Sequence, residues 1–402
     1  MHALIVGGGV AGPTTAMALQ KAGITSVVYE AHPDGVSERG AFLSLFANGM
    51  DALRAVDAHQ LVVERSFAVT SIEFATGSGK RLRDARIDQD RFGRLSEPRT
   101  LRRAELCRVL AEEAGRRGIR VESGKQLVSA VRTPAGRIMA TFKDGSEAEG
   151  DLLVGADGIH SVVRRMIDPV APRPRYTGED LVCGYASKAP VSAPDETMRM
   201  VYGKRAFFAY LTTPGGDTWW FVNIPGSTSA PDNPAAATPE EWKRRGLERV
   251  AGDDRAASDL IRATEDDVVG ISVFDIASTP LWHAGPMVII GDAAHAAAPN
   301  AGHGASMALE DSVVLAKCLR DMPGVDAAFT RYEQLRRPRV EELVATSASM
   351  KRRAIPGPLQ RLLRDFMLSR LLKDGPRNAA PWLTRHHIDS EEKTVPEVKD
   401  RQ

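Results

Sequence analysis

Three glycines near the N-terminus stand at a spacing that could bind a pyrophosphate. Gly7, Gly9 and Gly12 follow residues 3–6, an apolar run that predicts a buried parallel strand, and they open a helical pattern. Gly7 permits a tight turn, Gly9 lets the backbone approach a phosphate, and Gly12 allows the helix to pack closely on the strand. The free N–H groups and the positive end of that helix favour phosphate anions.

A carboxylate completes this unit. Glu30 follows residues 26–29, which predict a second strand. A carboxylate at that position accepts hydrogen bonds from a ribose 2′-hydroxyl and disfavours a 2′-phosphate. Strand, glycine turn, helix, second strand and acid together predict a dinucleotide site for an adenosine without a 2′-phosphate.

Two further carboxylates follow buried strands later in the chain. Asp157 comes after residues 151–154, and Asp292 comes after residues 287–290. A carboxylate such as Asp292 can bind a ribityl hydroxyl, and the glycine-rich residues 302–304 then open a long helix whose N–H groups favour negative charge. Each turn taken alone is also typical of an ordinary connection between a strand and a helix. The three turns in this order indicate one cofactor site.

With these motifs the chain resembles the class A flavoprotein monooxygenases, the para-hydroxybenzoate hydroxylase family. The resemblance covers residues 1 to 340 or so, and the paired Asp-Gly and Gly-Asp motifs are specific to this group. It implies a short member, without the thioredoxin-like C-terminal domain of the longer ones. The matching residues are the fingerprint Gly7, Gly9, Gly12 and Glu30, then Asp157, Gly158, Ser161 and Arg164, then Gly291 to His295, Pro299, Gly302, Gly304, Glu310 and Asp311.

The resemblance also implies roles for individual residues. Glu30 is expected at the FAD adenosine ribose, Asp292 at the ribityl chain, and Asp157 where FAD meets the nicotinamide nucleotide. His303 and Ser306 depart from the family, in which glutamine and asparagine are common at these positions. The expected cofactor-binding residues are Gly7, Gly9, Val10, Ala11, Gly12, Glu30, Arg39, Arg103, Leu127, Asp157, Asp292, Pro299, Gly302, Gly304 and Ala305.

The implied activity is that of an FAD-dependent monooxygenase. NADPH or NADH reduces a non-covalently bound FAD, and the reduced flavin with O2 forms a C4a-hydroperoxide that hydroxylates an electron-rich aromatic or polycyclic, polyketide-like molecule. The sequence contains one dinucleotide fingerprint, so the nicotinamide nucleotide is expected to bind transiently. No residue is predicted as a catalytic base.

Two other functions are compatible with an FAD fold. The first is a flavin-dependent halogenase, since residues 220–225, WFVNIP, approach that group's WxWxIP segment with valine in place of the second tryptophan. Lys80 is a poor candidate for the halogenase lysine, because it adjoins a Gly-Ser-Gly turn. The second is a non-catalytic FAD protein that holds a reactive intermediate.

A strand-rich, aromatic stretch between residues 181 and 225 predicts the substrate site. Alternation puts Phe208 and Tyr210 on one face, and Trp219 and Phe221 on one face of the neighbouring strand. An aromatic wall suits a bulky aromatic or polycyclic phenol, and Arg205 is the one candidate for clamping a small benzoate. The alternative is that both faces are core.

Composition excludes several classes of partner and site. A net charge of +1 over 402 residues gives no case for binding nucleic acid or an acidic membrane. Three widely spaced cysteines predict no disulfide framework, and nine histidines without an HxxxH pair predict no metal site. No window reaches the length of a membrane span. We therefore expect a cytoplasmic monomer or homodimer.

The predicted fold class is α/β. It comprises a Rossmann-like FAD-binding domain of the GR2 type, an inserted antiparallel β-sheet domain for the substrate, and C-terminal helices. The predicted limits are residues 1–70, 100–175 and 277–340 for the FAD-binding domain, 71–99 and 176–276 for the substrate domain, 341–389 for the C-terminal helices, and 390–402 for a disordered tail.

Overall fold

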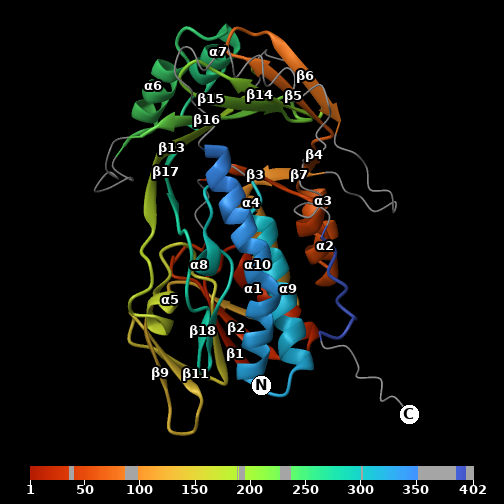
Figure 1. The fold of residues 1–402 in the computed structure, drawn as a ribbon, viewed down its shortest axis with the longest axis vertical. Helices are drawn as coiled ribbons and strands as arrows, with labels where there is room; N and C mark the ends of the chain where they lie inside the picture. The colour runs from red at the N-terminus through yellow and green to blue at the C-terminus, as the bar shows by residue number, and fades with distance from the viewer. Residues whose placement is uncertain are drawn as a thin grey trace.

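Two large sheets organise the molecule in the computed structural model (Figure 1). A six-stranded, mainly parallel sheet lies in one lobe, and a seven-stranded, mainly antiparallel sheet lies at the opposite end of the long axis. This arrangement confirms the predicted α/β class with an inserted antiparallel sheet. The structure describes residues 1–35, 40–86, 98–187, 189, 195–226, 237–299, 302–351 and 386–394.

The six-stranded sheet has the order β18-β19-β12-β1-β2-β8, and its neighbours are parallel except for β18 and β19. Its two central strands, β12 and β1, are almost fully buried and apolar apart from His2, as expected for a parallel sheet covered on both faces. The strands are β1 (His2–Val6), β2 (Thr25–Tyr29), β8 (Arg120–Glu122), β12 (Leu152–Gly155), β18 (His283–Ala284) and β19 (Met287–Ile289).

Long helices cover one face of this sheet, where α9 packs against α1, α2 and α10 (Figure 1). On the other face α5 contacts β12 and β19, beside a three-stranded sheet of β9, β10 and β11. The elements are α1 (Ala11–Lys21), α2 (Ala47–Ala55), α3 (His59–Glu64), α4 (Arg103–Arg116), α5 (Val162–Ile167), α8 (Asp292–His295), α9 (Gly304–Asp321), α10 (Val325–Lys351), β9 (Leu127–Arg132), β10 (Ile138–Phe142) and β11 (Glu147–Gly150).

The seven-stranded sheet has the order β17-β13-β16-β15-β14-β5-β6, and its one parallel pair is β14 with β5. Two helices, α6 (Pro239–Val250) and α7 (Arg255–Ala263), lie over one face, at the top of Figure 1. The strands are β5 (Ser71–Thr76), β6 (Arg81–Arg86), β13 (Arg175–Ala186), β14 (Thr197–Tyr202), β15 (Phe207–Thr212), β16 (Thr218–Pro225) and β17 (Val268–Asp275).

Two tryptophans build the core between this sheet and its helices. A Cβ on Gly184 of β13 would lie 2.3 Å from the indole of Trp220, and a Cβ on Gly270 would lie 2.0 Å from Trp242. Each glycine therefore makes room for one indole. Trp220 is fully buried, and its Nε1–H donates to Thr264 Oγ1 at 2.8 Å.

The opposite face of the seven-stranded sheet is directed toward a small sheet of order β3-β7-β4. This small sheet connects the two lobes, because β7 runs directly into α4 and β3 runs into α2. Its strands are β3 (Phe42–Leu45), β4 (Phe67–Ala68) and β7 (Arg99–Arg102).

The C-terminal segment 386–394 differs from its prediction. It contains no helix, and it lies against the long helices through specific contacts instead of forming part of a disordered tail. Asp51 of α2 accepts hydrogen bonds from the Ile388 N–H at 3.0 Å and pairs with His387 Nδ1 at 2.7 Å, while Ile388 is buried in the main core. Further along, the Thr394 N–H donates to Asp321 of α9 at 2.8 Å. These contacts are distant in sequence, so local composition could not reveal them.

Candidate cofactor and substrate site

Each of the three fingerprint positions requires a glycine for a different structural reason. Gly7 has a φ of +112°, and a Cβ there would lie 2.3 Å from the Ala156 carbonyl oxygen. A Cβ on Gly12 would lie 1.9 Å from the Gly7 carbonyl oxygen, so this glycine permits the turn itself. At Gly9 the nearest atom to such a Cβ is Arg103 Nη2, at 3.9 Å. Space is therefore kept open beside the Gly9 backbone, as an approaching pyrophosphate requires.

Glu30 stands behind the glycine turn. Its buried carboxylate accepts hydrogen bonds from the backbone N–H groups of Gly8 at 2.7 Å and His32 at 2.9 Å. A carboxylate can accept about four hydrogen bonds, so capacity remains for ribose hydroxyls. The Lys125 N–H donates to the Glu30 carbonyl at 2.8 Å, which brings the segment before Leu127 next to this acid. Leu127 itself is 5 % exposed.

Arg103 is the cation nearest to the glycine turn. It begins α4, its side chain is exposed, and its guanidinium is the group closest to the open side of Gly9. The other predicted arginine, Arg39, lies outside the described residues.

The Asp292 turn meets the starts of two helices. Gly291 has a φ of +57°, and a Cβ on it would lie 3.2 Å from Ala308 of α9 and 3.7 Å from Ala11 of α1. Asp292 is exposed, and its Oδ1 lies 3.8 Å from the Cβ position of Gly304. An exposed carboxylate, an exposed arginine and two helix N-termini thus surround the open backbone at Gly9. This donor and acceptor set fits the phosphates and hydroxyls of a dinucleotide.

The residues that open α9 contact the turn between β3 and α2. The His303 ring stacks on Phe46 with a centroid distance of 4.0 Å and an interplanar angle of 2°. The Phe46 N–H donates to Ser306 Oγ at 3.3 Å, and Gly302, with a φ of +67°, also faces the Phe46 ring. The two departures from the family pattern therefore pack against Phe46, a residue that the sequence analysis did not identify. Pro299 is exposed, and its carbonyl accepts the Gly302 N–H at 2.8 Å.

Asp157 makes its contacts within its own turn. Its Oδ2 accepts the N–H groups of Val162 at 2.7 Å and Val163 at 3.1 Å, at the start of α5. Burial raises the pKa of this carboxyl, although hydrogen bonds from Ser161 and the backbone act in the opposite direction. Oδ1 has no hydrogen-bond partner within the described part of the chain. The carboxylate is therefore a helix cap, a role that the sequence analysis did not assign to it.

Phe208 and Tyr210 do not lie where the sequence analysis expected. Phe208 is 1 % exposed and stacks near Trp220, with centroids 5.9 Å apart, on the face covered by α6 and α7. Tyr210 is 9 % exposed in the same cluster. Their assignment as substrate-binding residues is corrected, because alternation defines two faces but not which one the helices cover.

Arg205 is also displaced from any substrate face. It lies in the exposed loop between β14 and β15, and its Nη2 donates to the Ala251 carbonyl at 2.6 Å, just after α6. Its position on the helix-covered side is inconsistent with a clamp for a benzoate.

Trp219 and Phe221 lie on the opposite face, toward the small sheet. Both are half-buried, whereas their neighbours Trp220 and Val222 are fully buried. With residues from three other strands they form what we call the aromatic cluster. Its members are Phe42, Phe67, Tyr185, Trp219 and Phe221, joined by centroid distances of 5.2 to 6.3 Å.

The sequence analysis missed the other three members of this cluster. Phe42 and Phe67 belong to the small sheet, and Tyr185 belongs to β13. Register could have identified Tyr185, since it lies directly opposite Trp219 in the antiparallel pair. No local signal relates Phe42 or Phe67 to β16.

A hollow of about 290 Å³ adjoins the aromatic cluster at Tyr185. Arg102 lies over the Tyr185 ring, with Cζ 3.7 Å from its centroid, and its Nη2 donates to Asp267 Oδ2 at 2.8 Å. The remaining charged lining residues are all acidic: Asp217, Glu265 and Asp266. The hollow therefore presents mainly negative charge.

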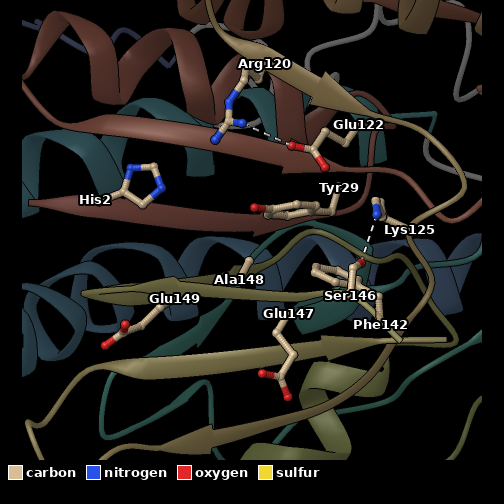
Figure 2. Close-up of a pocket in the computed structure, with 10 residues that line it drawn as sticks. All are labelled: His2, Tyr29, Arg120, Glu122, Lys125, Phe142, Ser146, Glu147, Ala148 and Glu149. Carbon is tan, nitrogen blue, oxygen red and sulfur yellow. Dashed lines mark hydrogen bonds and ion pairs between the residues drawn. The ribbon is translucent and has the colours of Figure 1, made fainter. Parts of the chain in front are cut away.

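A second hollow, of about 240 Å³, lies between β2, β8 and the β10–β11 hairpin (Figure 2). The rings of Tyr29 and Phe142 pack in it with centroids 4.6 Å apart. Charges of both signs line it, including the pair Arg120–Glu122 at 3.5 Å. None of the predicted cofactor residues lines this hollow.

Metal sites and membrane spans were also sought. The described residues contain no cluster of three or more His, Cys, Asp or Glu side chains suited to a metal ion. Among these residues no helix combines the length and the apolar character needed to cross a membrane. Cys107, Cys183 and Cys318 are all free and buried.

Comparison with known proteins identifies the family. Residues 1–347 match the FAD binding domain model. The chain is 30% identical over 350 residues to an aurachin C monooxygenase/isomerase from Stigmatella aurantiaca, covering 86% of this chain and 87% of the relative. It is 28% identical over 356 residues to a probable 2-heptyl-3-hydroxy-4(1H)-quinolone synthase from Rhodococcus erythropolis, covering 86% of each.

A solved structure agrees with this family assignment. The Klebsiella pneumoniae protein HpxO, crystallised with FAD and uric acid, superimposes with a TM-score of 0.82 at 26% identity, over 92% of this chain and 93% of that chain. The predicted family and cofactor are thereby confirmed, and the relatives favour an oxygenase over a halogenase or a non-catalytic protein. The chain belongs to the FAD-binding domain family and is an FAD-dependent monooxygenase of the class A flavoprotein type.

Proposed function

We propose that this enzyme hydroxylates an uncharged, flat aromatic or polycyclic molecule. NADH or NADPH supplies two electrons, one oxygen atom of O2 enters the substrate, and the other leaves as water. Bound FAD supplies the electron transfer and oxygen activation, and the protein supplies binding, orientation and exclusion of water.

The residues around the glycine turn are proposed to hold FAD in defined ways. The open Gly9 backbone and the Arg103 guanidinium would contact the pyrophosphate, since both face the same space. Glu30 would accept the ribose hydroxyls of the adenosine. Asp292, exposed beside the start of α9, would accept a ribityl hydroxyl. Asp157 is not proposed as a ligand, because its carboxylate caps α5.

The observation that carries the substrate class is the chemistry of the sheet face that includes Trp219 and Phe221. The centre of this face is uncharged, and the charged residues lie at its margins, where Glu179 at the start of β13 pairs with Pro225 and Arg83 of the edge strand β6 pairs with Phe74. A neutral, aromatic wall suits ring stacking and edge-to-face contacts, and the cation beside it, Arg102, is already paired with Asp267. By the strand registers the face comprises Ile72, Phe74, Leu181, Cys183, Tyr185, Met198, Met200, Tyr202, Phe207, Ala209, Leu211, Trp219, Phe221 and Asn223.

The acidic hollow beside Tyr185 supports the same substrate class. Asp217, Glu265 and Asp266 would repel an anionic ligand that approached the aromatic cluster from this side. Arg102 is already paired with Asp267 and stacked on Tyr185, so its charge is largely engaged. The names of two relatives mention a quinolone product and bound uric acid, and both are flat bicyclic rings, which is consistent with a flat ring system in the substrate.

The halogenase alternative has weaker support. Lys80 is exposed in the turn between β5 and β6, where its carbonyl accepts the Thr76 N–H at 2.9 Å. An exposed turn lysine does not provide the enclosed site that a reactive halogen species requires.

Substrate-stimulated NADH and NADPH oxidation tests the proposal. A panel of neutral bicyclic and polycyclic phenols is compared with benzoates of similar ring size, and 18O from 18O2 is traced into the product by mass spectrometry. Neutral polycyclic compounds should stimulate oxidation and gain one labelled oxygen. A preference for benzoates, or halide-dependent products, would contradict the proposed substrate class.

The two faces of β15 and β16 provide matched variants. Trp219→Ala and Phe221→Ala should retain FAD but raise KM about tenfold or uncouple NAD(P)H oxidation from hydroxylation, because they remove aromatic contacts with the substrate. Phe208→Leu, on the helix-covered face, should lower thermal stability while leaving KM unchanged. Normal KM and coupling in both alanine variants would exclude this face as the substrate wall.

A further inference from the structure

We propose that Arg336, on α10, is a positioning residue for cofactor binding that acts through the Asp292 turn. This inference rests on the FAD dependence of the family and not on the proposed substrate. Arg336 is 1 % exposed, and within the described part of the chain it bonds to Asp311, Glu310 and Met307, none of which is predicted to touch the cofactor.

Asp311 holds the Asp292 turn at both ends. One of its oxygens, Oδ2, accepts the Gly291 N–H at 2.8 Å and pairs with His295 Nε2 at 2.5 Å. Gly291 precedes Asp292, and His295 ends the short helix α8 that Asp292 begins. A single carboxylate oxygen thus fixes the two residues that bracket the proposed FAD ligand.

Arg336 in turn fixes Asp311. Its Nε donates to Asp311 Oδ1 at 2.6 Å, its Nη1 pairs with Glu310 Oε2, and its Nη2 donates to the Met307 carbonyl at 3.2 Å. The planar guanidinium therefore bonds at once to two consecutive acids of α9 and to a backbone carbonyl of the same helix. A lysine ammonium cannot reproduce this geometry, because it is a point charge without a planar fork.

Glu310 is held by other groups as well. Arg339 Nη2 donates to its Oε1 at 2.7 Å, and Asn48 Nδ2 of α2 donates to the same oxygen at 2.6 Å. Glu310 therefore keeps partners when Arg336 changes, whereas among the described residues Asp311 Oδ1 bonds to Arg336 alone. Replacing the Arg336 guanidinium should therefore mainly change how Asp311 is held.

The backbone at Gly291 explains why the turn needs support. Its φ of +57° and ψ of −140° leave the next residue pointing away from the path of β19. Arg164 also supports the turn, since its Nη1 donates to the Ala293 carbonyl at 2.9 Å, but Asp311 holds the Gly291 N–H directly before Asp292. Asp311 is buried, and its two oxygens bind Arg336 on one side and the Gly291 turn on the other. It can therefore set the direction of the Asp292 carboxylate.

The test compares Arg336→Lys with Arg117→Met. Arg117 also pairs with a buried acid, Glu113, at 2.7 Å, but it follows the far end of α4, about 20 Å along the helix from Arg103. The dissociation constant for FAD is measured on apoprotein by quenching of flavin fluorescence, and the melting temperature of each apoprotein is recorded. Arg336→Lys should weaken FAD binding about tenfold, and Arg117→Met should leave it within about twofold.

A double-mutant cycle with Asp292→Ala separates positioning from a general loss of stability. If Arg336 acts through Asp292, Arg336→Lys should have little further effect on FAD binding once Asp292 is absent. Wild-type FAD affinity in folded Arg336→Lys, or an undiminished effect in the Asp292→Ala background, would overturn the proposal. Should Arg336→Lys fail to fold, the same cycle with Asp311→Asn, which preserves side-chain shape, gives the same two outcomes.

Discussion

Asp157 and Asp292 occupy equivalent places at the ends of neighbouring parallel strands, yet their surroundings are opposite. The Asp157 carboxyl is buried, and its Oδ2 accepts two N–H groups of the helix that follows. The Asp292 side chain is exposed, and the turn that carries it is held from behind by Asp311. One acid stabilises its own turn, whereas the other is kept available by a second acid.

We infer that Asp292 is the better placed of the two acids to bind a ligand, because Asp311 performs the structural work of its turn. At Asp157, Oδ2 is engaged by two backbone N–H groups and Oδ1 is buried. The glycine turn after β1 divides its tasks in the same way, since Gly7 and Gly12 shape the turn and Gly9 remains open.

The largest expected effect is the difference between valine substitutions at Gly12 and at Gly9. Gly12→Val should yield no folded protein, because its Cβ would lie 1.9 Å from a backbone oxygen that cannot move without breaking the turn. Gly9→Val should fold but lose FAD, because its nearest neighbour is the end of the Arg103 side chain, at 3.9 Å. Circular dichroism melts and the flavin content of purified protein measure the two outcomes. Full FAD retention in Gly9→Val would contradict the assignment of the pyrophosphate to this turn.

A smaller effect compares the two acids directly. Asp292→Ala should weaken FAD binding by about 1 to 3 kcal/mol, recoverable with excess FAD, and leave apoprotein stability unchanged. Asp157→Ala should instead destabilise the apoprotein by about 1 to 2 kcal/mol, because the N–H groups of Val162 and Val163 at the start of α5 lose their acceptor. Urea unfolding of the apoproteins and FAD titrations give both quantities. Equal losses of FAD affinity in the two variants would remove the distinction between them.

The smallest effect concerns pH. Burial raises the folded-state pKa of Asp157 above its ordinary value of 3.8, so the native state binds this proton more tightly than the unfolded chain does. Asp157 therefore favours folding at acidic pH, and this contribution is lost as pH rises through the raised pKa. The free energy of unfolding of wild type, relative to Asp157→Asn, should fall as the pH rises above about 4. A difference that stays constant or rises would contradict the buried state of this carboxyl.

The cofactor unit was predictable because its signals are local. Gly7, Gly9, Gly12 and Glu30 lie within one strand-helix-strand unit, and each performs a task that few other residue types can perform. The role of Asp157 was harder to predict from the sequence. Its helix begins five residues later, and the same sequence permits either a ligand or a cap.

The substrate face was predicted only in part. Alternation correctly separated Phe208 and Tyr210 from Trp219 and Phe221, but the choice between the faces depends on where α6 and α7 pack. Those helices follow β16 in the chain, and no local pattern in the strands records their position. The contacts of Arg336 and of residues 386–394 join segments far apart in sequence, so they were equally beyond a local analysis.

The pairing of Trp220 with Gly184 has a consequence for laboratory evolution of this enzyme. As long as position 220 carries an indole, position 184 tolerates no side chain, so a substitution at Gly184 requires a smaller residue at position 220. Trp219 and Phe221 have no such constraint from a glycine partner, since they face away from α6 and α7. Libraries that vary the half-buried face and leave the Trp220 face untouched should therefore retain a large fraction of folded members.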